Sequence, residues 1–165
     1  MKNQELIGKE LLLTVNYSYN LKKVITPRAY SWSDEKINTS NFSPPFYKPN
    51  KERIIMKLFH YKKPVSTKKA AKDIVKSGFN LANLYELIAL GKKYPNLQHE
   101  FAVFALGSQI LYGANSVQFP VLIFGVDTKY QGYYPTPETK ARGIMLFNAS
   151  IYSYTCLYAG VKIKK

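Results

Sequence analysis

The sequence predicts an α+β fold, on three observations. Residues 10–19 alternate apolar and polar positions with a period of two, which is typical of a strand with one buried face. Residues 66–94 contain two helical patterns with capping residues, and from Phe101 onward the chain consists of short apolar runs. A strand, then helices, then several strands favours an α+β fold. The length of 165 residues suits a single domain over 1–165.

The first half of the chain is predicted to hold two strands separated by a short helix and a loop. Residues 21–30 favour a helix that ends near Pro27. Residues 31–51 carry Ser, Asn, Lys and three prolines, which is typical of a surface loop. Residues 53–61 are rich in β-branched and aromatic side chains and predict the second strand.

Both predicted helices begin at a capping residue. Ser66 caps the first, which continues over residues 68–76 and ends at Gly78. Asn83 caps the second, and Glu86 stands three residues later, as a capping box requires. The predicted inner faces are Ala70, Ala71, Ile74 and Val75 in the first helix and Leu84, Leu87, Ile88 and Gly91 in the second.

Two glycines indicate special backbone positions. Gly91 lies inside the second helix, where glycine costs about 1 kcal/mol relative to alanine, so we expect another element to approach closely there. Gly107 follows a predicted strand and precedes Ser108. We expect a tight turn with positive φ at Gly107, a conformation that β-branched residues cannot adopt.

Residues 101–165 are predicted to be rich in strands, with residues 1–100 as the scaffold. The segment 126–142 contains two prolines and has no periodicity, so we expect a long loop. We expect the first strand to pair with the last, and the two helices to pack on a small antiparallel sheet. The candidate strands are 101–106, 117–125, 143–147 and 156–164.

Composition excludes several classes of protein. Apolar residues make up 46% of the chain and charged residues 21%, so the chain is globular rather than disordered. No run approaches the roughly 20 apolar residues of a membrane-spanning helix, and residues 1–10 lack the apolar core of a secretory signal. We therefore expect no membrane insertion and, by default, a cytoplasmic location. A single cysteine, Cys156, excludes an internal disulfide framework.

The charge is strongly positive, at +14, because 24 Lys and Arg residues stand against 10 Asp and Glu residues. Residues 48–76 are the most basic segment, with only Glu52 and Asp73 as anions. This segment supports one hypothesis, a nucleic-acid- or ribosome-associated protein. A solvated helix face is the alternative interpretation of its lysines Lys68, Lys69, Lys72 and Lys76.

Common sequence motifs of catalytic sites are absent from the chain. The chain contains neither HExxH, GxSxG, a Walker loop nor GxGxxG. His60 and His99 fall in or before predicted strands and are interpreted as structural. Asp34 and Glu35 lie in a polar loop, and nothing in the sequence places a base beside Cys156. We expect a non-enzymatic protein without a metal or cofactor.

Tyrosines are concentrated near the C-terminus, where half of the 14 lie between residues 112 and 158. They are interleaved with Ser, Asn, Gly and Thr, as in GYYPT and SIYSYT. Large amphipathic rings beside small hydrogen-bonding side chains are typical of antibody-like binding surfaces. Ordinary amphipathic strands are the alternative interpretation.

Three segments resemble variable proteins of diversity-generating retroelements. These are residues 80–109, which include the motif Ala-Leu-Gly-Ser at 105–108, the strand FPVLIFG at 119–125, and LFNASIYSYTCLYAGVKIK at 146–164. The chain departs from the family's pattern at Leu146, where a Trp usually stands, and in having few arginines. Lys129, Gln131, Glu138 and Lys140 cannot arise from mutated Asn codons, so the resemblance makes them scaffold or insertion.

The resemblance implies a C-type-lectin fold, in the version shared with formylglycine-generating enzymes, and a hypervariable C-terminal face that binds another protein. Binding would use aromatic anchors and adaptable polar contacts. The candidate ligand-binding residues are Tyr112, Asn115, Tyr130, Tyr133, Tyr134, Asn148, Ser150, Tyr152, Tyr154 and Cys156.

Overall fold

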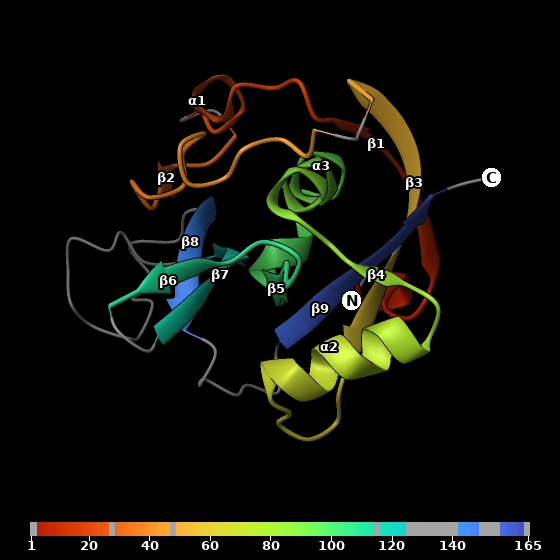
Figure 1. Cartoon of the computed structure of the whole chain (residues 1–165). Coiled ribbons are helices and arrows are strands. Elements are labelled where there is room, and N and C mark those ends of the chain that lie inside the picture. The colour runs from red at the N-terminus through yellow and green to blue at the C-terminus, as the bar shows by residue number, and fades with distance from the viewer. Residues whose placement is uncertain are drawn as a thin grey trace.

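A nine-stranded sheet with helices on both faces forms the described part of the chain (Figure 1). The computed structural model describes residues 3–26, 29–46, 49–113, 116–124, 142–148 and 156–163. Its strands are β1 (Glu10–Asn16), β2 (Trp32–Ser33), β3 (Lys51–His60), β4 (Asn80–Leu81), β5 (Ala102–Phe104), β6 (Ile110–Tyr112), β7 (Ser116–Phe124), β8 (Arg142–Asn148) and β9 (Cys156–Ile163). Its helices are α1 (Leu21–Val24), α2 (Thr67–Lys76) and α3 (Leu84–Lys93), with 3-10 turns at Gln4–Leu6 and Leu97–His99. The predicted α+β fold is confirmed.

The strand order is β1-β3-β9-β5-β7-β8-β2, with β4 beside β9 and β6 beside β7. Most pairs are antiparallel, but β5 runs parallel to β9 and β2 runs parallel to β8. The predicted pairing of the first and last strands is wrong, because β3 lies between them: Met56 pairs with Leu11 on one side and Val161 on the other. The predicted small antiparallel sheet is a larger, mixed one.

The position of β3 has a physical reason in its burial. Ile54, Met56 and Leu58 are almost completely buried, so one face of β3 lies in the main core. With ten residues, β3 is long enough to pair with β1 and β9 over overlapping registers. Strand patterns show which face is buried but not which strand lies alongside, so the sequence could not order β1, β3 and β9.

Helix α3 forms the centre of the main core. Its predicted capping box is present, since Asn83 accepts from the Glu86 backbone N–H and Glu86 accepts from that of Asn83. The predicted inner face is confirmed by the burial of its four residues. A Cβ on Gly91 would lie 2.5 Å from the Tyr30 hydroxyl oxygen and 2.9 Å from Leu122 of β7, which confirms the predicted close approach.

Helix α2 covers the opposite face of the sheet. Ser66 caps it by accepting from the Lys69 N–H, and Gly78 follows its end with a φ of 80°, as predicted. Ala70 and Ile74 are fully buried, but the prediction for Val75 is wrong, because this side chain is 59% exposed. At 100° per residue, Val75 points well away from the direction shared by Ala70 and Ile74.

The four candidate C-terminal strands are confirmed as β5, β7, β8 and β9, whereas the predicted loop at 126–142 lies almost entirely outside the described residues. Sequence analysis missed β2, β4 and β6, which have two or three residues each and are too short to show a period. Both faces of β9 are covered: Leu157 and Ala159 face the α3 core, and Tyr158 packs in the cluster with α2.

Candidate functional site

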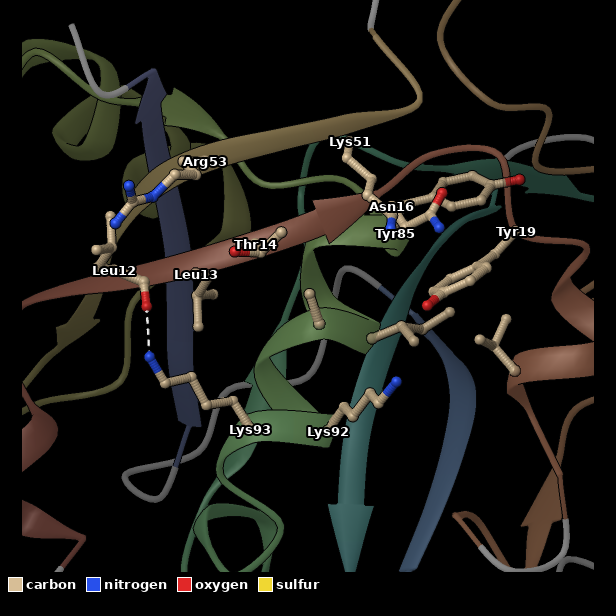
Figure 2. Close-up of a pocket in the computed structure, with 13 residues that line it drawn as sticks. Leu12, Leu13, Thr14, Asn16, Tyr19, Lys51, Arg53, Tyr85, Lys92 and Lys93 are labelled. Carbon is tan, nitrogen blue, oxygen red and sulfur yellow. Dashed lines mark hydrogen bonds between the residues drawn. The ribbon is translucent and has the colours of Figure 1, made fainter.

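A groove of about 710 Å³ runs along the outer edge of β1, where residues of β1, β3 and α3 line it (Figure 2). Strand β1 ends the sheet and pairs with β3 alone among the described strands. Four cationic side chains line the groove, and its described lining contains no carboxylate, imidazole or thiol. We refer to it as the β1–α3 groove. Its four cations are Lys51, Arg53, Lys92 and Lys93.

The β1–β3 ladder supplies two of these cations. Arg53 pairs with Thr14, and Lys51 pairs with Asn16, so both cations project from one face of the ladder beside polar partners. Glu52 stands between them in sequence, but neighbouring side chains alternate between the faces of a strand. Glu52 pairs with Val15, so the acid lies on the face of the ladder that packs on α3, whereas Lys51 and Arg53 lie on the opposite face. The described lining of the groove includes the two cations and not the acid.

The last turn of α3 supplies the other two cations, Lys92 and Lys93. Cations are favoured at this end of a helix, where the backbone dipole is negative. The Lys93 ammonium donates a hydrogen bond of 2.6 Å to the Leu12 carbonyl of β1, as the dashed line in Figure 2 shows. The Lys92 ammonium is directed to the other side, 5.8 Å from the centre of the Tyr19 ring.

Two tyrosines give the groove an aromatic wall. Tyr85 is buried, donates to the Phe42 carbonyl, and has a pKa raised by burial, so it stays neutral and adds no negative charge. Tyr19 is 36% exposed and extends into the groove from the segment between β1 and α1 (Figure 2). Aromatic and cationic side chains in one groove suit a ligand with anionic groups and flat rings.

Three predicted binding residues lie within the described part of the chain, and the structure does not bring them together with the groove. Tyr112 is 52% exposed on β6, with the Lys36 ammonium 3.7 Å from its ring centre. The half-buried Asn148 of β8 donates to Ser116 of β7. The other predicted residues, apart from Cys156, lie outside the described residues: Asn115, Tyr130, Tyr133, Tyr134, Ser150, Tyr152 and Tyr154.

The place given to Cys156 among the ligand-binding residues needs correction. Its side chain is only 6% exposed and belongs to the core cluster that includes Phe104 and Tyr158. A thiol at this depth contributes packing rather than contact with a protein at the surface. Cys156 begins a strand that is covered on both faces, which a period-two pattern alone does not reveal.

The basic segment 48–76 is divided between two regions of the molecule. Lys51 and Arg53 line the β1–α3 groove, while Lys68 and Lys72 are exposed on α2. The solvated helix face proposed for α2 fits its exposed lysines, one of which, Lys69, forms an ion pair of 2.9 Å with Asp73. The sequence pattern did not separate the groove cations from the helix cations.

The other side chains that could take part in catalysis or metal binding are not grouped into a site. The His60 ring packs against Phe101, and the His99 ring stacks on Phe124, with centroids 3.9 Å apart. Among the described residues, no group of three or more His, Cys, Asp and Glu is placed to hold a metal ion. The helices within this part of the chain are too short or too polar to cross a membrane.

The β1–α3 groove was missed by sequence analysis because its parts come from residues 12–24, 51–53 and 85–93, which only the fold brings together. The one available signal was the presence of Lys51 and Arg53 in the basic segment. Comparison with known proteins adds no family: no family model, no curated protein and no solved structure matches this chain.

Proposed function

We propose that this protein is a non-enzymatic nucleic-acid-binding protein that holds phosphate groups in the β1–α3 groove. The observation that carries the proposal is that Lys51, Arg53, Lys92 and Lys93 line one groove whose described lining has no carboxylate. A polyanion can neutralise these cations while it releases its own counterions. The net charge of +14 adds a long-range attraction for the same class of partner.

An acidic peptide is the main competing ligand, because an edge strand can accept an added strand. The hydrogen bond from Lys93 argues against it. An incoming strand would need the Leu12 carbonyl as an acceptor, and the Lys93 ammonium already occupies that position. A nucleic acid needs no backbone pairing, since its phosphates contact the lysine and arginine side chains directly.

Charge-matched variants test the proposal. The groove variant is Lys51→Gln with Arg53→Gln, and the control is Lys68→Gln with Lys72→Gln on α2, which removes the same charge elsewhere. Fluorescence anisotropy measures the Kd for a labelled single-stranded oligonucleotide of about 12 nucleotides, between about 50 and 200 mM salt. We expect the groove variant to weaken binding about tenfold or more and to reduce the salt slope by about 1 to 2, since each lost phosphate contact removes about 1.

Three outcomes would contradict the proposal. The wild type does not bind the oligonucleotide at low salt; the α2 control weakens binding as much as the groove variant does; or polyglutamate of equal charge competes as well as unlabelled oligonucleotide. The second outcome assigns binding to the diffuse positive field, and the third assigns the groove to acidic peptides. Melting temperatures of both variants verify that each is folded.

The second candidate function is the retroelement variable protein with a C-type-lectin fold, which displays its C-terminal residues to a protein ligand. The observation that favours it is the exposure of two large side chains on β6, Leu111 at 78% and Tyr112 at 52%. Its test is the flanking DNA. A near-copy of the C-terminal coding stretch that differs mainly at adenines, beside a reverse transcriptase gene, would support it. A complete genome without such a copy would contradict it.

A further inference from the structure

We infer that the β1–α3 groove takes single-stranded rather than duplex nucleic acid, with one base stacked on the Tyr19 ring. The inference rests on the proposed function and specifies its ligand. Tyr17 and Tyr19, two positions apart in the alternating segment 10–19, lie in different environments. Tyr17 is 2% exposed and donates 2.7 Å to the buried Glu86 carboxylate, whereas Tyr19 is 36% exposed and lines the groove.

The backbone on both sides of Tyr19 is fixed by side-chain hydrogen bonds. Before it, Asn16 accepts from the Ser18 N–H at 3.0 Å and from the Ser18 hydroxyl, which forms a turn at the end of β1. After it, Asn20 accepts from the Lys22 N–H at 3.0 Å and caps α1. Tyr19 is thus held between a turn and a helix cap, so its backbone is already ordered before a ligand binds.

Two lysines line the same groove as this ring. The Lys92 ammonium lies 5.8 Å from the ring centre, and Lys51 reaches the same end of the groove from the strand above it in Figure 2. The Lys92 ammonium lies over one face of the ring, so a base would stack on the opposite face, with Lys92 and Lys51 in the same groove to neutralise its phosphates. Stacking platforms combined with positive grooves are typical of proteins that bind single strands.

A duplex cannot place a base flat on the Tyr19 ring without distortion. Its bases are already stacked on their neighbours, so a flat contact with Tyr19 requires that a base be removed from the stack. A single strand presents its base faces without that cost. The chemistry of the site therefore discriminates between the two forms through the aromatic ring, while the cations attract both forms.

The test compares Tyr19→Leu with Tyr19→Phe and with Tyr112→Leu, a control that removes another exposed tyrosine ring. Three labelled probes of equal length are used: an oligothymidylate, an abasic oligomer with the same phosphates but no bases, and a duplex. We expect Tyr19→Leu to weaken oligothymidylate binding about 5- to 100-fold, the range that stacking of one base produces. Abasic binding should stay unchanged, and both Tyr19→Phe and Tyr112→Leu should behave as the wild type does.

Two results would overturn the inference and leave the proposed function intact. In the first, the wild type binds the abasic oligomer or the duplex as tightly as oligothymidylate. In the second, Tyr19→Leu weakens the abasic and thymidylate probes equally, which would show that the ring acts only on the shape of the groove. Failure of the wild type to bind any of the three probes would instead contradict the proposed function, and the inference with it.

Discussion

The Lys93 ammonium and the Leu12 carbonyl oxygen, 2.6 Å apart, connect the last turn of α3 to the edge strand of the sheet. The same helix packs on β7 through Gly91, whose Cα faces Leu122. In the strand order, β1 and β7 are separated by β3, β9 and β5. The sheet therefore curves around α3 (Figure 1), and the β1–α3 groove lies where this curve ends.

Removal of the Lys93 ammonium should loosen this end of the sheet. We expect Lys93→Met to lower the free energy of unfolding by about 1 kcal/mol, the usual net value of one hydrogen bond. Urea denaturation measures the change. Lys92→Met is the matched control, because its ammonium contacts the Tyr19 ring rather than a backbone carbonyl. Equal losses in both variants would show that charge near the helix end, and not the bond to Leu12, is responsible.

The close packing at Gly91 predicts that alanine destabilises the protein there, although alanine is normally the better helix former. Gly91→Ala should gain about 1 kcal/mol in helix propensity. It should lose more, because its Cβ would lie 2.5 Å from the Tyr30 hydroxyl oxygen, and overpacking a core costs about 1–3 kcal/mol. We expect a net decrease in the free energy of unfolding, measured by urea denaturation.

A second substitution tests the cause of that decrease. The Tyr30 hydroxyl is buried and makes no hydrogen bond within the described structure, and its burial raises the Tyr30 pKa to about 12. Tyr30→Phe removes the atom nearest to the new Cβ and leaves no partner unpaired. It should therefore be nearly neutral alone and should restore part of the stability of Gly91→Ala. No restoration would assign the cost to Leu122.

The structure gives a reason for the glycine at position 107 that differs from the predicted one. The predicted positive φ at Gly107 is wrong: among the described glycines, positive φ values occur at Gly8, Gly78 and Gly113. A Cβ at Gly107 would instead lie 2.4 Å from the carbonyl oxygen of Leu81 and 2.8 Å from that of Ala82, both backbone atoms. Close approach of two backbone segments, rather than an unusual conformation, requires the glycine.

Even Gly107→Ala should therefore destabilise the protein, by about 1–3 kcal/mol, since neither carbonyl can rotate away as a side chain would. The hydrogen bond from the Gly107 N–H to the Ala82 carbonyl, 2.8 Å long, would be strained by the same shift. Calorimetry of Gly107→Ala measures the effect. A melting temperature equal to that of the wild type would show that the two segments can separate without loss.

The helix caps could be predicted from the sequence, whereas the order of the strands in the sheet could not. The capping box of Asn83 and Glu86 and the cap at Ser66 depend on residues three apart, so their patterns are complete within a few positions. The insertion of β3 between β1 and β9 depends on which buried strands fit together. The β1–α3 groove depends on that order, because Lys51 and Arg53 lie beside β1 only when β3 is the strand that pairs with it.

The last prediction concerns acid stability and Asp73 on α2. The Lys69 ammonium donates a hydrogen bond of 2.9 Å to the Asp73 carboxylate, and this contact, with a second hydrogen bond from the Tyr61 hydroxyl, lowers the Asp73 pKa below its usual value. A carboxyl group with a lowered pKa in the folded state stabilises the protein above its unfolded pKa, and this contribution is lost as the pH falls through the folded value. Asp73→Asn should therefore melt below the wild type at pH 7, and the difference should shrink as the pH falls below about 4. Asp34→Asn in the surface loop is the comparison variant. If the difference for Asp73→Asn stayed constant down to the lowest pH, the ionised carboxylate would not be its source.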